Sequence, residues 1–481
     1  MFKEVTYKTN ELSQIISKDK HLNLVTKQFM KRVQGYIHEC FQKVKIIDKP
    51  NKDLEYLYNK RTFLRSKTDN KSKKDLEDVD EELCDKYSEV MYKKIMEEVL
   101  EGIEDCEDGG FNTGKLWRLK KKLLPALGEP PTAMLNSEGK LLTLEKDIKE
   151  EAVKHSQKVF KNKNINKGLE HLKDEQELLC KKRLKKVSRS KTSPWTVEDV
   201  TNVLKSLKNG KSKDPYDIPN ELFKPSVAGD NLILAITLLM NRIKDELIFP
   251  NPMNLCNVTN LYKNKGSQQV FDSYRGIFRT PVLRNILDKL IYEDKYEDID
   301  STLTDCNVGS RKRRNVRDNL FVLNAITNAS KLNPKEALDI VVYNVIKCFD
   351  SLWMSECINM LYEAGLQNDK LVLLHKSNEH ANIVVKTSSG TTDRFPISNN
   401  VMQGTVWGGL MCTSTLDGLQ KLLLQEEQLL YNYCGAVSVP PLEMVDDVIT
   451  VVEYGNKSIT VNAVVNAFIE SKKLVLSAAK C

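Results

Sequence analysis

The chain has 481 residues, 41% of them apolar, and a formal net charge of +7; this length and apolar content suffice for roughly three globular domains and exclude a disordered protein. The longest nearly unbroken apolar stretch, residues 232–240, is far shorter than the ~20 residues of a membrane helix, and the N-terminus lacks a signal-peptide apolar region, so we expect an intracellular protein of the nucleus or cytoplasm. The 11 cysteines are odd in number and include no Cys-x-x-Cys pair, so neither a zinc finger nor a disulfide framework is indicated, and buried or reduced thiols are expected.

Residues 1–194 read as a charged, helical N-terminal extension. Residues 10–18, 24–44 and 83–103 carry apolar side chains at three- and four-residue spacing, and their alternating acidic and basic runs are typical of solvated helical faces. Pro130 and Pro131 interrupt this pattern and predict a loop or a short hairpin. We place the main domain boundary at residue 194, after the basic run 181–191.

Residues 195–481 change to a mixed α+β pattern. Thr196 is positioned to cap a helix with Asp199 three residues later, and an apolar stripe then runs to Asn209-Gly210. A second helix is expected from Thr280-Pro281, with apolar residues on one face. Strands are expected at 339–346, 382–387 and 448–454 because these runs are rich in β-branched residues.

The most specific chemical feature is the adjacent pair Asp446 and Asp447, between two strand-like runs. Aspartate is an ordinary turn residue, so the pair needs partners before it indicates a site. Polymerases that use two magnesium ions need carboxylates on neighbouring strand ends, because Mg²⁺ takes oxygen ligands. The candidate second strand is 339–346, which we expect to run into a helix that starts near Asp350 and ends at Gly365.

Several motifs in one order, over residues 195–481, resemble the fingers and palm of reverse transcriptases from LINE-type non-LTR retrotransposons, a class of transposable element. They are NGKSKDPYDIPNELFK (209–224), NLYKNKGSQQVFDSYRGIFRTPVLRNILDKLIY (260–292), VGSRKRRNVRDNLFVL (308–323), the Asn344 strand, VMQGTVWGGLMC (401–412) and MVDD (444–447). The resemblance implies a right-hand polymerase fold with an antiparallel palm sheet. It also implies nucleotidyltransferase chemistry: an RNA-directed DNA polymerase that binds an RNA template, a DNA primer, dNTPs and two Mg²⁺ ions, without a membrane partner.

Site residues follow from the resemblance position by position. Asp446 and Asp447 match the metal-binding acids. Phe349 matches the aromatic gate against a ribose 2′-hydroxyl, and Gln403-Gly404 matches the turn that touches template and nucleotide. The nucleotide-binding cations match Lys263, Lys265, Arg275 and Lys480, and the basic segment Arg311, Lys312, Arg313, Arg314 and Arg317 matches a backbone contact for nucleic acid.

The chain departs from the family at a catalytic position. Asn344 stands where the family has its principal metal-binding aspartate, and an amide supplies no negative charge. Asp339 and Asp350 are the nearby acids, but the first lies far along the strand and the second resembles a helix cap. Gly276 and Gly409 replace family prolines, which predicts slightly looser segments. These changes are typical of a truncated, degenerate or repurposed copy, with no thumb segment before residue 481.

Other signals stay open or are rejected. Residues 109–116 have phosphate-loop spacing, but they follow no strand and Leu116 replaces the magnesium-binding hydroxyl. The run 181–191 fits a nuclear import signal, an RNA-contacting arm or a linker equally well, and 311–317 fits a solvated loop as well as a phosphate contact. Two main hypotheses follow: a weakly active reverse transcriptase, and an inactive nucleic-acid-binding relic. A helical scaffold is the third.

Overall fold

The computed structural model describes residue 16, residues 21–43, isolated positions between 56 and 86, and residues 133–160, 170–332, 338–345, 348–379, 381–388, 390–397, 401–433, 437–445, 447–453 and 456–472. Contacts divide the chain into two compact units, residues 1–38 with 132–481 and residues 39–131. The larger unit therefore begins before the boundary predicted at residue 194. The segment 109–116, Asp446 and Lys480 lie outside the described residues.

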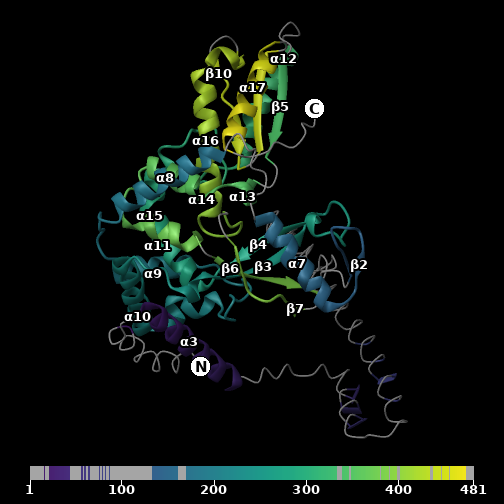
Figure 1. Cartoon of the computed structure of the whole chain (residues 1–481), viewed down its shortest axis with the longest axis vertical. Helices are drawn as coiled ribbons and strands as arrows, with labels where there is room; N and C mark the ends of the chain where they lie inside the picture. The colour runs from purple at the N-terminus through teal and green to yellow at the C-terminus, as the bar shows by residue number, and fades with distance from the viewer. Residues whose placement is uncertain are drawn as a thin grey trace, which may run out of the picture. The chain divides into compact units, whose positions relative to one another are not determined.

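The described part is a mixed α+β structure (Figure 1). Its helices are α3 (Leu22–Lys43), α7 (Glu145–Phe160), α8 (Glu170–Val187), α9 (Val197–Ser206), α10 (Pro225–Glu246), α11 (Val282–Asp300), α12 (Val316–Leu332), α13 (Cys348–Ser351), α14 (Met354–Glu363), α15 (Asp369–Glu379), α16 (Gly408–Gln425) and α17 (Asn456–Ser471). Short 3₁₀ turns lie at Asn220–Phe223, Asn251–Asn254, Phe271–Ser273 and Glu427–Leu429.

Two sheets carry most of the strands. The first has the order β4-β3-β6-β7, with β8 paired to β6; β3 and β6 are parallel and the other pairs are antiparallel. The second is antiparallel, with the order β11-β12-β5. Their strands are β3 (Leu255–Tyr262), β4 (Tyr274–Arg279), β5 (Leu338–Asn344), β6 (Ala381–Thr387), β7 (Gly390–Thr391), β8 (Phe395–Ile397), β11 (Leu442–Met444) and β12 (Asp447–Glu453). Two small hairpins are β1 (Met134–Leu135) with β2 (Leu141–Leu142), and β9 (Asn432–Tyr433) with β10 (Val437–Ser438).

Helix α7 covers the first sheet (Figure 1). Its buried face, Ile148, Ala152 and Phe160, joins the core formed by β3, β4 and β6, and the rings of Phe160 and Phe278 lie 5.4 Å apart. This packing follows from the i, i+4 spacing of its apolar residues. A segment that we assigned to the N-terminal extension therefore completes the sheet core of the larger unit.

Local sequence signals predicted several elements correctly. Thr196 and Asp199 form a reciprocal capping box at the start of α9, which ends slightly early, at Ser206. Helix α11 starts directly after Pro281, and the predicted strands appear as β5, β6 and β12. The segment after Pro131 forms the β1-β2 hairpin.

The single helix predicted from Asp350 to Gly365 was wrong. The chain forms α13, leaves the helical conformation at Trp353 (φ −90°, ψ 132°), and then forms α14. Leu352 and Trp353 are both buried, at 1% and 3% exposure. One continuous helix places adjacent side chains on different faces, so the break lets both enter the core.

Candidate functional site

The β5-β12 pair brings Asn344 next to Asp447. The two residues are direct partners in the antiparallel register, and Asn344 Nδ2 donates a hydrogen bond of 2.7 Å to Asp447 Oδ1. An ionised carboxylate only accepts hydrogen bonds, so the amide must present its nitrogen to it. The structure thus places the replaced position and one acid of the MVDD motif side by side, at the exposed ends of their strands.

A tight turn sets this register. Met444 pairs with Asp447, and Val445 has a positive φ of 61°, which is rare for a β-branched residue. Gly309 lies against the turn: a Cβ on Gly309 would stand 2.3 Å from the Val445 nitrogen. The glycine of the VGSRKRR motif therefore lets the loop before α12 approach the hairpin closely.

The described donors do not by themselves fit a two-ion magnesium site. The amide of Asn344 occupies one oxygen of Asp447, and no group of three or more histidine, cysteine, aspartate or glutamate side chains in the described part of the chain is arranged to hold a metal ion. Such a site needs several anionic oxygen ligands to balance two dications. What the structure shows at these strand ends is an amide-carboxylate hydrogen bond between Asn344 and Asp447.

A cavity of about 300 Å³ opens beside Asn344. Its lining includes five residues that the sequence analysis assigned to the nucleotide site or to the position of a metal ligand: Lys263, Arg275, Asn344, Phe349 and Gln403. They come from the β3-β4 hairpin, the β5-α13 connection and the loop before α16, so the fold gathers them from three distant segments. Lys265 is exposed and is not part of this lining.

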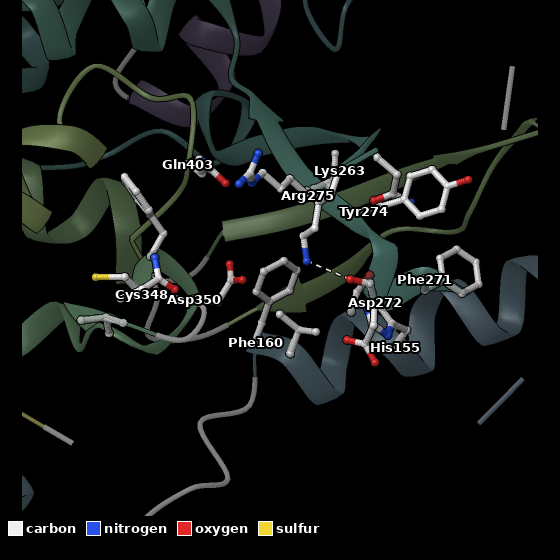
Figure 2. Close-up of a pocket in the computed structure, with 18 residues that line it drawn as sticks. His155, Phe160, Lys263, Phe271, Asp272, Tyr274, Arg275, Cys348, Asp350 and Gln403 are labelled. Carbon is white, nitrogen blue, oxygen red and sulfur yellow. Dashed lines mark hydrogen bonds between the residues drawn. The ribbon is translucent and has the colours of Figure 1, made fainter. Parts of the chain in front are cut away.

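Two cations stand on the β3-β4 side of the cavity (Figure 2). Lys263 Nζ donates a 2.8 Å hydrogen bond to the backbone oxygen of Asp272, which holds its charge at the cavity wall. The Arg275 guanidinium points toward the Gln403 side chain (Figure 2). Ammonium and guanidinium groups placed in this way suit a phosphate-bearing ligand.

Glycine is required at the turn next to Gln403. Gly404 has a φ of +102°, and a Cβ there would lie 2.9 Å from the Phe278 carbonyl oxygen. The Phe278 amide also donates to the Gln403 carbonyl at 2.9 Å. The turn is therefore fixed to β4, which positions Gln403 at the cavity.

Sequence reasoning missed the part of the cavity wall that α7 forms. Helix α7 contributes His155, Ser156, Val159 and Phe160, and the His155 ring stacks on Phe271 with 5.5 Å between centroids. Asp350, interpreted above as a helix cap, also lines the cavity. These contacts join segments far apart in the chain, and no local sequence pattern specifies them.

The basic segment after Gly309 is mostly paired within the protein. Arg311 is buried and donates to Asp300 Oδ1 at 2.7 Å and to the Thr304 and Asn307 carbonyls at 2.6 and 2.9 Å. Lys312 pairs with Glu293 and Arg314 with Asp305, whereas Arg313 and Arg317 are exposed. These partners enclose the Arg311 guanidinium, so the fold gives no support to the predicted phosphate contact of Arg311.

Part of the run 181–191 also contacts the protein. Arg183 bonds to the Asn359 carbonyl and Glu363, and its guanidinium lies over the Tyr362 ring. Lys191 donates to the Asp245 carbonyl. These contacts fasten α8 and the following linker to α14 and α10.

A second cavity, of about 540 Å³, lies beside α9, α11 and the β3-β4 hairpin and is lined by cations. Its lining includes Lys208, Lys211, Arg279 and Lys289 together with Gly404. Burial lowers the pKa of Lys289, and repulsion from Lys208 and other lysines lowers it further while Glu293 opposes this. The lining thus holds four cationic side chains and one carboxylate, that of Asp214. Parts of its lining belong to motifs quoted from the sequence, including Lys211, Arg279, Lys289 and Gly404.

An acidic side chain is buried on β11, one strand of the β11-β12 hairpin. Glu443 is 0% exposed, and among the described residues neither carboxylate oxygen has a hydrogen-bond partner. Burial, followed by repulsion from Asp417, raises the pKa of Glu443 well above the ordinary value of 4.5. Burial therefore favours the protonated form of the Glu443 side chain in the folded protein.

This burial predicts a pH-dependent stability. A raised folded-state pKa gives a contribution that is fully present below about pH 4.5 and is lost as pH rises through the folded pKa. Glu443→Gln keeps the shape without the titration, so it should raise the free energy of unfolding at pH 8 by about 1 kcal/mol or more and have little effect at pH 4.5.

Urea unfolding at both pH values checks this expectation. Glu453→Gln, at an exposed position on the neighbouring strand, is the matched control and should leave the pH dependence unchanged. An identical pH dependence in Glu443→Gln and the parent protein would show that Glu443 does not titrate as described.

Comparison with known proteins gives little further information. The chain matches no protein-family model and no curated protein. Among solved structures it is similar to telomerase from Candida albicans in complex with a TWJ fragment of telomeric RNA, with a TM-score of 0.32 and 12% identity. The match covers 47% of this chain and 42% of the telomerase chain, too weak a likeness to bear on function. In the described residues, no helix is long and apolar enough to span a membrane.

Proposed function

We propose that the chain is a nucleic-acid-binding protein of the reverse-transcriptase type, with a fingers and palm arrangement of the right-hand kind and an impaired catalytic centre. It binds an RNA template, a DNA primer and a dNTP, and it extends the primer weakly or not at all. The observation that carries this proposal is the cavity that joins Lys263, Arg275, Phe349 and Gln403 to the Asn344-Asp447 pair.

The two poles of this cavity suit a nucleoside triphosphate. Lys263 and Arg275 would bind the phosphates of the nucleotide, and Phe349 would face its sugar. The opposite pole supports weak chemistry, because Asn344 contributes an amide where a metal ligand needs charge. Mg²⁺, if it binds, would be held by Asp447 and Asp446 with reduced affinity.

The second cavity supports nucleic-acid binding. Its cations lie on one side of the β3-β4 hairpin, and Asn260 of the first cavity lies on the other. Gln403 lines the first cavity, and Gly404 lines the second. A strand lying there would place its phosphates near Lys208 and Lys211 and reach the nucleotide cavity through the Gln403-Gly404 turn. The alternative is an inactive protein that only binds nucleic acid. Polymerase activity of the Asn344→Asp variant would distinguish the two, because the alternative predicts none.

We expect sequence-tolerant, salt-sensitive binding of the full chain to an RNA/DNA hybrid. Replacing both Lys208 and Lys211 with glutamine should weaken binding and reduce the slope of log affinity against log salt by about 1.4 to 1.8, since each phosphate contact contributes ~0.7–0.9. Fluorescence anisotropy across a salt titration measures both quantities.

Lys181→Gln with Lys182→Gln removes the same charge from the exposed face of α8 and is the matched control. A smaller effect of this pair places the strand at the second cavity. Affinity that does not change with salt would refute a phosphate-binding surface altogether.

A further inference from the structure

A pair of thiols lies at the wall of the nucleotide cavity. Cys348 Sγ of α13 and Cys412 Sγ of α16 are 3.2 Å apart, and their residues are 2% and 0% exposed. Neither cysteine forms a disulfide in this structure. A disulfide has a sulfur-sulfur length of about 2.05 Å, so the sulfurs need to close by only about 1 Å.

We propose that Cys348 and Cys412 form a reversible disulfide, and that this oxidation controls the nucleotide cavity. The cross-link joins α13, which carries Phe349 and Asp350 at the cavity, to α16, which follows the Gln403-Gly404 turn. The thiol chemistry is independent of the proposed function, whereas its consequence for nucleotide binding rests on it.

Of the two cysteines, Cys348 is the one that borders the cavity. Cys348 lines the cavity, and Cys412 does not. A small hydroperoxide entering the cavity therefore meets Cys348 first, and the resulting sulfenic acid faces Cys412. The second thiol is in place to resolve it.

The reaction balances with hydrogen peroxide as the oxidant. The Cys348 thiolate attacks one peroxide oxygen, the O–O bond breaks, and the leaving hydroxide takes the thiol proton to form water. The Cys412 sulfur then attacks the sulfenic sulfur, the S–O bond breaks, and the departing hydroxide takes the Cys412 proton to form a second water. Two thiols lose two electrons in total, and one peroxide gains them.

The neighbouring buried thiols are poorer candidates. Cys357 accepts a 3.5 Å hydrogen bond from Thr415 Oγ1, and burial raises its pKa to about 12. Burial likewise raises the pKa of Cys256 to about 11. The thiolate is the reactive form, so these residues react slowly at neutral pH.

The cross-link has a predictable effect on the cavity. Cys348 belongs to the wall and Cys412 lies behind it, so closing the sulfur-sulfur distance draws α13 outward, away from Lys263 and Arg275. Nucleotide contacts between the two sides then lengthen. The oxidised protein should bind dNTP several-fold more weakly than the reduced protein.

Peptide mapping of the full chain tests the thiol pair without any ligand. After brief hydrogen peroxide treatment, alkylation of the remaining thiols and digestion, mass spectrometry should find a Cys348–Cys412 peptide that dithiothreitol separates. Cys412→Ser should instead leave a Cys348 sulfenic acid that dimedone traps, and Cys256→Ser should behave as the parent. Alkylated Cys348 and Cys412 after oxidation, or a Cys348–Cys357 pair, would overturn the proposal.

Equilibrium dNTP binding, measured before and after oxidation and after reduction, tests the consequence. Weaker binding that recovers on reduction, and that is absent in Cys412→Ser, supports control of the cavity. A mapped disulfide with unchanged dNTP affinity overturns that control. A mapped disulfide with no dNTP binding in either state refutes the proposed nucleotide site and leaves the thiol pair established.

Discussion

Replacing Asn344 with aspartate is expected to raise primer extension on an RNA template by at least about a hundredfold. The substitution puts a second carboxylate beside Asp447, where an amide now donates a 2.7 Å hydrogen bond. Two facing carboxylates repel each other unless a dication binds between them. The variant should therefore bind Mg²⁺ more tightly than the parent. A metal ion supplies several kcal/mol of transition-state stabilisation, and each ~1.4 kcal/mol is tenfold in rate.

The assay compares the parent, Asn344→Asp and Asn344→Ala with Mg²⁺, dNTPs and an excess of template and primer. Asn344→Ala removes the amide hydrogen bond without adding charge, so it should stay as inactive as the parent. Equal, robust extension by all three proteins would mean that position 344 is not the missing ligand. A gain in Asn344→Ala alone would assign the defect to the hydrogen bond itself.

Arg311→Ala is expected to destabilise the protein by about 3 kcal/mol, because it removes the charged partner of Asp300 and the donor to the Thr304 and Asn307 carbonyls. The Arg311 side chain is 2% exposed and that of Asp300 is 23% exposed. Burial raises the pKa of Asp300, but hydrogen bonds from Arg311 and Tyr296 outweigh it and lower the pKa overall. The contribution of Asp300 is therefore present above the ordinary value of 3.8 and is lost as pH falls through the lowered folded pKa.

Urea unfolding at neutral pH and near pH 3 measures both effects. Arg317→Ala is the control, since Arg317 belongs to the same basic segment but is exposed. Arg311→Lys keeps the charge but not the several donors, and it should fall between the parent and Arg311→Ala. Full stability in Arg311→Ala, combined with weaker RNA binding, would restore the original interpretation of Arg311 as a phosphate contact.

Local patterns predicted the elements, because caps and apolar periods act within a few residues. The Thr196-Asp199 capping box, the start of α11 after Pro281 and the strands β5 and β12 all follow from such signals. The resemblance to reverse transcriptases also predicted which strands should meet, and the register places Asn344 opposite Asp447.

Contacts between distant segments were not visible in the same way. The α7 wall of the cavity depends on packing between His155 and Phe271, which no local pattern specifies. A run of basic letters likewise does not reveal that Asp300 and three backbone carbonyls enclose Arg311. The break at Leu352 and Trp353 arises because both side chains are buried, a tertiary requirement that overrides helix periodicity.

The central claim is that the cavity is a nucleotide site whose metal pole lacks the carboxylate of position 344. Equilibrium dNTP binding by the parent and Asn344→Asp, with and without Mg²⁺ and in the presence of template and primer, tests it most directly. The account predicts weak binding to the parent that does not depend on Mg²⁺, and at least tenfold tighter, Mg²⁺-dependent binding to Asn344→Asp. The same affinity in both proteins regardless of Mg²⁺, or no binding to either, would contradict it.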